Sequence, residues 1–420
     1  MTTKTIITNR RERLEKALDL AQAYRGWSRK ELATELGRDA TKLIPESGNP
    51  KFDMILRLAE VLDWTLDEVS DWVWYGNNKT KSNDKVSIKT TFVDLDGKAQ
   101  EAHRIGEYKK MVAIAHSALD IAKSPEERAR AYNRAAGGWD GTGRFRRVLR
   151  AAQAGLREHP IPSDLRLLLQ STAANAHYTL WQLDEAEGMA QRVVTYYEEN
   201  KPETDRAKVA QAHGLYVLGH THRRLLEIET DQSSAHAQTA KSYLQKAEAY
   251  YEELARTIHP NYGGIANTCR CGVLEAEVFL GSINAREAIA RIFDVINSVI
   301  DPTTFEKGDW LESYGWWCIA GCNITLRHIT EERDIQRFMA MFTNKADEIS
   351  ERLNHWAMRE RVFSMQFEGH QRLVGWTGQT IPIVIDNDDV RLITGTMGRF
   401  PQFRETGWLI LNCGNIVQDA

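Results

Sequence analysis

The stretch GWSRKELATELGRDATKLIPESGNP, residues 26–50, decides the fold of the N-terminal part of the chain. Ser28 stands where a helix N-cap belongs, and Glu31, three residues later, completes a capping box. The pattern therefore predicts a short helix that begins after Ser28 and is stopped by Gly37. Together with the helix expected before Gly26, it predicts a helix-turn-helix opening.

The second half of the same stretch limits the next helix. Asp39 is a suitable N-cap, but Pro45 has no N–H and would clash with the carbonyl group four residues earlier. Proline also disfavours helical angles at the residue before it, Ile44. We therefore expect the third helix to run only from about residue 40 to residue 43 or 44.

Apolar residues on both sides of the stretch recur at helical spacing. Residues 11–24 place one apolar face on a helix: Leu14, Ala17, Leu18, Ala21 and Tyr24. After Asn49-Pro50 a second face is followed by Thr65 as a new N-cap and by a last turn: Phe52, Ile55, Leu58, Ala59 and Leu62, then Leu66 and Val69. These segments predict a bundle of short helices in residues 1–74.

The segments resemble the DNA-binding domain of the XRE family, the phage-repressor type of helix-turn-helix. GWSRKELATELG followed by ESGNPKFDMILRLAEVLDWTLDEV matches the order of that family's helix pair, Glu-x-Gly turn, proline and final helices over residues 14–69. Compared with the family, about one helical turn is missing between Gly37 and Asn49. The recognition helix is therefore expected to be unusually short.

The resemblance implies that this domain binds double-stranded DNA. Recognition helices contact base edges mainly through their N-terminal residues, so a short helix retains its most useful positions. Arg38, Thr41 and Lys42 are the candidates for contacts in the major groove, and Arg29 and Lys30 for contacts with phosphates.

Basic residues are concentrated at the N-terminus. Residues 1–30 contain eight Lys or Arg and three Asp or Glu, whereas residues 31–74 contain four and ten. The formal net charge of −4 argues against bulk electrostatic coating of nucleic acid, so any contact with DNA must come from a local patch. The expected basic face comprises Arg10, Arg11, Arg13, Lys16, Arg25, Arg29 and Lys30.

A linker is expected over residues 75–104. Its first part, YGNNKTKSNDKVSIK, lacks apolar periodicity and is rich in Asn, Ser, Lys and Gly. The following TTFVDLDG predicts a short strand and a turn. Two domains joined by such a linker are expected to reorient relative to each other.

Residues 105–374 contain a repeat. GEYKKMVAIAHSALDIA, GRFRRVLRAAQAGLREHP and WQLDEAEGMAQRVVTYYEE begin at Gly106, Gly143 and Trp181, 37 and 38 residues apart, which is the period of a helical hairpin. They resemble the second helices of tetratricopeptide repeats, with first helices in EERARAYNRAAGGW and LRLLLQSTAANAHYTL. The resemblance implies an all-α chain with an α-solenoid whose inner surface is concave.

The concave surface of such an array holds extended peptides through polar side chains around aromatic anchors. Polar residues interrupt the apolar or small-residue stripes of the expected first helices, and we take six of them as candidate contacts with a ligand or partner: Asn133, Asn175, Tyr178, His213, Tyr216 and His220. The other interpretation is that each satisfies a turn or a neighbouring helix within the core.

Residues 375–420 predict a terminal arm or cap of irregular and β structure. TIPIVIDNDDVRLI contains two β-rich runs around residues 386–389, which is the pattern of a hairpin turn. Glycine and proline interrupt the helical patterns that follow.

No pattern in the sequence predicts catalysis. Phosphate-binding loops, nucleophile elbows and paired-carboxylate motifs are absent from the sequence, so we expect neither an enzyme nor a cofactor. Cys269, Cys271, Cys318 and Cys322 lack a zinc-finger spacing and lie in apolar surroundings, so buried free thiols are expected rather than a metal site. Without a signal-peptide or membrane-span pattern, a cytoplasmic protein is expected.

An XRE-like domain ahead of tetratricopeptide-like repeats resembles bacterial regulators whose repeats bind a signal or mediate dimerisation. We therefore expect a homodimeric transcriptional regulator whose partners are double-stranded DNA and a peptide or protein ligand. The alternative is an adaptor whose repeats scaffold other proteins and whose N-terminal domain does not read DNA.

Overall fold

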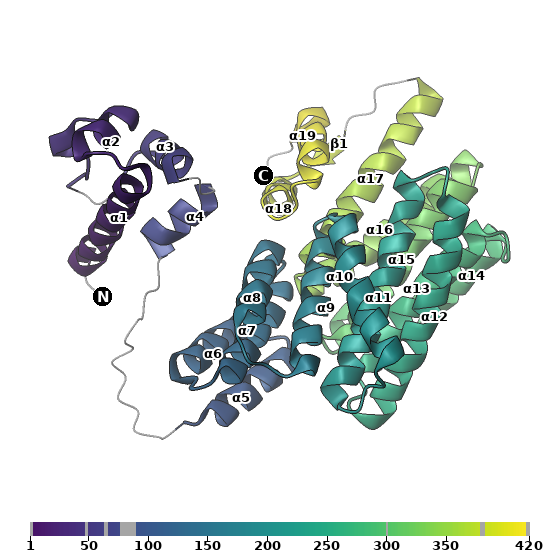
Figure 1. Cartoon of the computed structure of the whole chain (residues 1–420). Helices are drawn as coiled ribbons and strands as arrows, with labels where there is room; N and C mark the ends of the chain where they lie inside the picture. Colours follow the sequence, from purple (N-terminus) through teal and green to yellow (C-terminus); the bar gives the residue numbers. More distant parts are fainter. Residues whose placement is uncertain are drawn as a thin grey trace. The chain divides into compact units, whose positions relative to one another are not determined.

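Helices make up nearly all the regular structure, so the predicted all-α class is confirmed (Figure 1). A computed structural model of the chain describes residues 3–46, 49–62, 66–75, 90–299, 301–378 and 383–416. The chain divides into an N-terminal unit, Met1–Ile88, and a C-terminal unit, Lys89–Ala420. None of the described helices combines the length and the apolar character needed to cross a membrane.

The N-terminal unit begins with two helices whose ends follow the sequence prediction. Ser28 and Glu31 form the predicted capping box, in which the Ser28 N–H donates to the Glu31 carboxylate at 2.7 Å and the Ser28 hydroxyl accepts from the Glu31 N–H. Gly26 and Gly37 adopt positive φ angles after the two helices. The elements are α1 (Thr3–Arg25), α2 (Arg29–Glu35), η1 (Ala40–Lys42), α3 (Phe52–Leu62), α4 (Leu66–Ser70) and η2 (Asp71–Tyr75).

The third helix is shortened further than predicted, to the single 3-10 turn η1. Asp39 caps it as expected by accepting from the N–H of Thr41 at 2.8 Å. Leu43, 1% exposed, then enters the core and Pro45 follows two residues later. The chain therefore leaves the helical path as soon as one turn is complete.

The core of the N-terminal unit contains most of the predicted apolar faces. Leu14, Ala17, Leu18 and Ala21 are fully buried against residues of α2, α3 and α4. Two residues that were predicted to lie on these buried faces are exposed instead: Tyr24 is 59% exposed and Phe52 is 68% exposed. Both lie in the terminal turn of a helix, where the neighbouring helices no longer cover them, and the predicted cap Thr65 lies outside the described residues.

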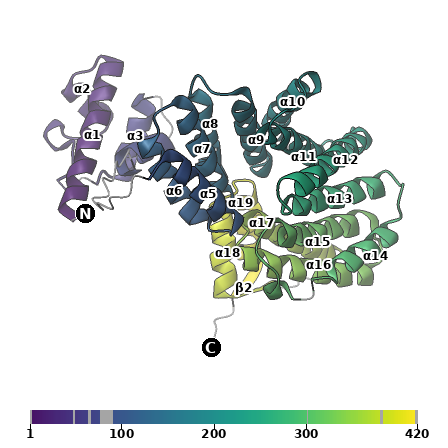
Figure 2. The same ribbon diagram turned by 90° about the horizontal axis from the view of Figure 1, so that it is seen from below.

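The C-terminal unit is an array of consecutive helical hairpins (Figures 1 and 2). Odd-numbered helices from α5 to α15 are the first of each pair, the even-numbered helices are the second, and α17 follows. Their bounds are α5 (Phe92–Arg104), α6 (Tyr108–Ile121), α7 (Pro125–Asp140), α8 (Phe145–Arg157), α9 (Ser163–Thr179), α10 (Leu183–Glu199), α11 (Asp205–Ile228), α12 (Ser233–Thr257), α13 (Tyr262–Phe279), α14 (Ala285–Ile296), η3 (Pro302–Thr304), α15 (Asp309–His328), α16 (Glu332–Leu353) and α17 (Trp356–Thr377).

The predicted repeat period reflects the turns inside these hairpins. Gly106, Gly143 and Trp181, at which the three repeat segments begin, all adopt the left-handed conformation, with φ angles of 72°, 67° and 62°. Glycine enters this region without a steric cost, whereas the Trp181 side chain must be held there by its surroundings. The same backbone turn therefore recurs between the helices of the first three hairpins.

The expected linker is wrong in its last part. Residues 92–104 form α5, because Thr91 and Asp94 make a capping box that starts a helix where a strand was predicted. Asp96 of α5, with a side chain 8% exposed, accepts from Arg130 and Arg134 of α7. This helix therefore belongs to the first hairpin, and residues 76–89 of the expected linker lie outside the described residues.

The predicted hairpin near residues 386–389 is also wrong. Asp386 and Asp389 form a capping box that starts α18 (Asn387–Met397), and α19 (Phe403–Cys413) follows. Strand β1 (Ile383–Ile385) pairs in parallel with β2 (Gly414–Ile416) rather than with the next run. The acidic residues that form this capping box are also common in turns, which is why the sequence suggested a hairpin at this point.

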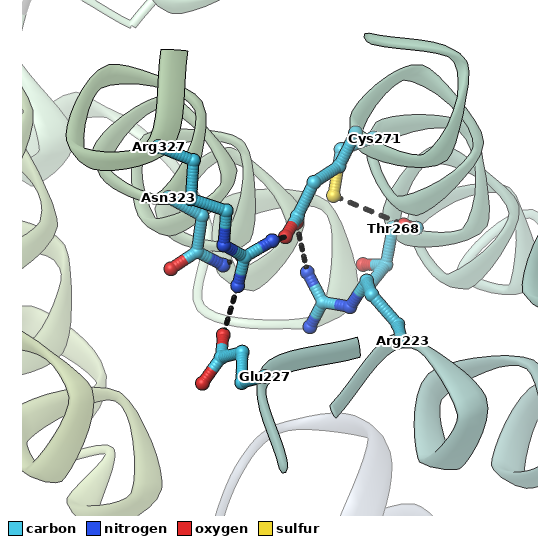
Figure 3. Close-up of polar contacts among 7 residues, drawn as sticks. Arg223, Glu227, Thr268, Cys271, Asn323 and Arg327 are labelled. Carbon is cyan, nitrogen blue, oxygen red and sulfur yellow. Dashed lines mark hydrogen bonds and ion pairs between the residues drawn. The ribbon is translucent and has the colours of Figure 1, made fainter. Parts of the chain in front are cut away.

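A buried polar network ties α11, α13 and α15 together (Figure 3). The carboxylate of Glu275, 2% exposed, accepts from Arg223 at 2.7 Å, from Arg327 at 2.8 Å and from the amide of Asn323 at 3.0 Å. Burial alone would raise the pKa of Glu275, but the two arginines more than offset this and leave the pKa below its ordinary value. Arg327 also pairs with Glu227 of α11, so the network fixes the three inner helices.

Candidate functional site

The inner helices of the C-terminal unit form the walls of two adjoining cavities with volumes of about 540 Å³ and about 410 Å³. The larger reaches the start of α17 and the smaller reaches α13. Because many residues line both, the two are lobes of one space, which we call the central cavity. The shared side chains are His103, Tyr108, Asp140, Asn175, Tyr216, Asp309 and Glu312.

The sequence predicted a concave surface, but α17 gives this surface a further wall. Gly143, in the turn between α7 and α8, lies so close to α17 that a Cβ atom on it would stand 2.7 Å from the Cβ of Trp356. Ala357 of α17 packs in one apolar cluster with Phe145 and Val148 of α8, together with residues of α18 and α19. The end of the array therefore packs against its second hairpin.

Three carboxyl groups from two helices line the central cavity. Asp140 is the last residue of α7, Asp309 is the first residue of α15, and Glu312 follows three residues later. The side-chain amide of Asn175 on α9 donates to Asp140 at 3.4 Å. The helix ends that carry these acids are brought together only by the packing of the hairpins.

Glu312 has the strongest partners of the three. Its carboxylate accepts from the indole N–H of Trp316 at 2.9 Å, and the Nε2 atom of His355 lies 3.1 Å from the same oxygen. His355 caps α17, since its Nδ1 accepts from the N–H of Met358. Burial raises the pKa of Glu312, but His355 and Trp316 reverse this effect, so that the net pKa is lowered.

Asp309 and Asp140 are perturbed in the opposite direction. Burial, and then the charge of Glu312, raise the pKa of Asp309 to about 7. The same two causes raise the pKa of Asp140 to about 6, against the smaller influence of His355 and Asn175. Near neutral pH, the cavity therefore holds carboxyl groups that are only partly ionised.

The arginines near the carboxyl groups are engaged elsewhere. Arg134 donates to Asp96 at 2.8 Å. Arg224 donates to the carbonyl oxygen of Tyr178, and its guanidinium carbon lies 3.9 Å from the centroid of the Tyr178 ring. Desolvation in the cavity wall, with the charge of Arg134, lowers the pKa of His103 and favours the neutral ring.

The structure places five of the six predicted ligand residues in the cavity wall. Asn175, Tyr178 and Tyr216 line the larger lobe, while Asn133 and His213 line the smaller one. The sixth, His220, is 2% exposed and lies behind Tyr216, with the two ring centroids 4.3 Å apart. His220 therefore lies in the core, which was the alternative role given for these polar residues.

Sequence reasoning missed the acidic residues and His355. Asp309 and Glu312 occupy the first turn of a helix, where acids are favoured by the helix dipole and carry no signal of a site. Asp140 ends a helix, and His355 serves as an N-cap. Local pattern accounts for each of them, and only the tertiary fold brings them together.

The predicted DNA-binding residues of the N-terminal unit fall into two groups. Arg29 and Lys30 begin α2 and Lys42 ends η1, and all three side chains are exposed. Arg38 instead donates to Asp53 of α3 at 2.7 Å, and the Thr41 hydroxyl donates to Asp39 at 2.5 Å. Each residue of the second group therefore makes a side-chain hydrogen bond within the unit.

The predicted basic face is narrower than the sequence indicated. Arg13 donates to the carbonyl oxygen of Val73 at 3.1 Å, and Arg25 donates to that of Val61 at 2.8 Å. Arg10 donates to the side chain of Asn49. These arginines bind main-chain and side-chain acceptors of the same unit, which leaves Arg11 and Lys16 of α1 exposed together with Arg29 and Lys30 of α2.

The four cysteines of α13 and α15 lie in the core of the C-terminal unit. Cys269, Cys271, Cys318 and Cys322 are buried free thiols, as predicted, and burial raises the pKa of each. Within the part of the chain that the structure describes, no group of three or more His, Cys, Asp or Glu residues is arranged to hold a metal ion.

Comparison with known proteins adds no assignment: no protein-family model matches the chain, and no curated protein matches it. The central cavity and the exposed cations of α2 and η1 are therefore the features that point to a function.

Proposed function

We propose that the protein is a transcriptional regulator in which the N-terminal unit binds duplex DNA and the C-terminal unit binds a signal molecule. The observation that carries the proposal is the pair of exposed cations at the start of the capped helix α2, followed after one turn by exposed Lys42. Cations at such positions suit phosphate contacts, and the resemblance to XRE domains assigns them that role.

The central cavity supports the second half of the proposal. Its larger lobe, at about 540 Å³, falls within the range of about 300–1,000 Å³ that small-molecule sites occupy. It also combines aromatic side chains with a few polar groups that converge from different helices. A ligand enclosed there would contact α7, α11, α15 and α17 at once and change how tightly these helices are held together.

An adaptor function is the second candidate, and one observation favours it. The element in the recognition position is a single 3-10 turn, and two of the five predicted DNA contacts are engaged within the unit. Few side chains of this surface are then left to contact DNA bases, whereas docking to another protein does not depend on such contacts.

Electrophoretic mobility shift of the full-length protein on mixed-sequence duplex DNA separates the two candidates. We expect binding at about 50 mM salt that weakens steeply by about 200 mM. The double variant Arg29→Ala/Lys30→Ala should lose it, whereas Lys98→Ala/Lys201→Ala removes two exposed lysines of the C-terminal unit and should leave it unchanged. If the wild type fails to bind at the lower salt concentration, or if both double variants bind alike, the regulator is rejected and the adaptor is favoured.

A further inference from the structure

We propose that the central cavity binds its ligand through a protonated primary amine, held among Asp140, Asp309 and Glu312. The inference deepens the proposed function by naming the chemistry of the signal, and it rests on that function only for the assignment of ligand binding to the C-terminal unit.

The three carboxyl groups lack enough positive charge around them. His355 lies beside Glu312, and even a fully charged imidazole would offset one carboxylate. Asp140 has only a neutral donor, the amide of Asn175. Within the described ranges no partner is found for the carboxyl of Asp309, and the charge that acts on it is that of another acid, Glu312.

The neighbouring cations do not fill this deficit. Arg134 is committed to Asp96, and Arg224 is committed to the carbonyl oxygen and ring of Tyr178. Arg104, which lines the smaller lobe, pairs with Glu101 at 3.4 Å. The lining lysines Lys109, Lys110 and Lys307 are exposed, so they lie at the solvent side of the larger lobe. An ammonium group placed among the acids would provide the missing counter-charge where the protein supplies none.

Aromatic side chains line the same cavity as the three carboxyl groups. Tyr108 and Tyr216 line both lobes, Trp316 lines the larger lobe, and Tyr251 and Tyr262 line the smaller one. Aromatic faces attract ammonium groups, most strongly where the contact is shielded from water. The ring of Tyr216 is held edge-on against His220 and Tyr251, so it is fixed before the ligand arrives.

Two kinds of molecule share this chemistry and fit the cavity: a linear polyamine and the amino terminus of a short peptide. Isothermal titration of the full-length protein at pH 8 therefore uses spermidine and C-terminally amidated triglycine as probes. N-acetylated, amidated triglycine and 1,8-octanediol are their uncharged counterparts. We expect saturable binding of at least one amine and at least tenfold weaker binding of its uncharged counterpart.

Binding of spermidine alone identifies a polyamine site, and binding of triglycine alone identifies a peptide amino terminus; either supports the proposal. If neither amine binds at millimolar concentration, or if the uncharged counterparts bind equally well, the proposal is overturned. The assay contains no DNA, so a protein that fails to bind DNA still gives a readable result here.

Variants locate the bound amine. Asp309→Asn should weaken amine binding at least tenfold, because it removes the carboxyl group without a partner. Asp388→Asn is the matched control, since Asp388 also lies in the first turn of a helix, α18, but its side chain is 76% exposed and lies outside the cavity. Circular dichroism confirms that both variants are folded, and equal amine affinity of the wild type and Asp309→Asn would overturn the assignment.

Discussion

The turn residue Gly143 and the first residue of α17, Trp356, are in direct contact: a Cβ atom on Gly143 would stand 2.7 Å from the Cβ of Trp356. Real Cβ atoms essentially never approach that closely. The contact joins the second hairpin to α17, and the φ angle of 67° at Gly143 favours glycine independently.

Gly143→Ala is therefore expected to destabilise the protein by about 2–4 kcal/mol, from backbone strain and from displacement of Trp356. Gly106→Ala is the matched control, because Gly106 occupies the same turn position with a φ angle of 72° but has no atom within 4 Å of an added Cβ. It should lose only about 1 kcal/mol. Urea denaturation measures both, and equal losses would show that the contact with Trp356 contributes nothing.

Removing the charge of Glu275 should be among the most damaging single changes in the C-terminal unit. Glu275→Gln leaves Arg223 without its buried counter-charge and leaves Arg327 with Glu227 alone, which is expected to cost about 3–5 kcal/mol. Glu287→Gln, in an exposed pair with Arg291, should cost less than about 0.5 kcal/mol. Urea denaturation at pH 7 compares the two, and a small loss for Glu275→Gln would mean that the arginines find other partners.

Asp309 should make stability depend on pH in an unusual direction. Its pKa is about 7 in the folded protein against 3.8 for the unperturbed group, so the folded state keeps a proton that the unfolded chain releases. Its contribution to the free energy of unfolding is therefore greatest below pH 4 and is lost as the pH rises to 7.

The Asp309→Asn variant removes this titration. Relative to the wild type, it should gain about 1–2 kcal/mol of stability between pH 5 and pH 8, less than the full shift implies because solvent in the cavity screens the charge. Taking the difference between variant and wild type cancels the other groups that titrate around the cavity, including Asp140, His103 and His355. Urea denaturation at both pH values tests this, and an unchanged difference would mean that Asp309 is ionised at both.

Lys42 tests whether η1 reads sequence. If its exposed amine contacts a base edge, Lys42→Ala should cost about 1–3 kcal/mol on a selected site and relax the sequence preference. Arg29→Ala should weaken binding to every duplex alike, because a phosphate contact carries no sequence information. Selection from a random duplex pool followed by mobility shift measures both, and equal losses on selected and random DNA for both variants would exclude base reading by Lys42.

Local signals in the sequence predicted the elements of the fold well. The Ser28–Glu31 capping box and the cap at Asp39 form as predicted, and the repeat segments that begin at Gly106, Gly143 and Trp181 each start in the turn before the second helix of a hairpin. The errors also have a local cause, because the acids near Asp386 suit a turn as well as a capping box. Both patterns use the same short polar side chains to bind nearby N–H groups.

The sequence predicted only part of the candidate site. Polar interruptions of inner helices identified Asn175, Tyr216 and three other lining residues, since those interruptions are visible in one helix at a time. The carboxyl groups were missed because their significance depends on Asp140, Asp309 and Glu312 lining one cavity together with His355. That arrangement is set by the packing of separate hairpins, and no spacing within the sequence contains it.

The wall that α17 adds to the cavity also has a consequence for how the protein is made. Ribosomes release the chain from its N-terminus, and earlier hairpins can pack as they emerge. The contacts between Phe145 and Ala357 have a large sequence separation, so they form only after residue 357 has left the ribosome, and such contacts are slow to form. A nascent chain that ends before α17 therefore lacks this wall of the central cavity.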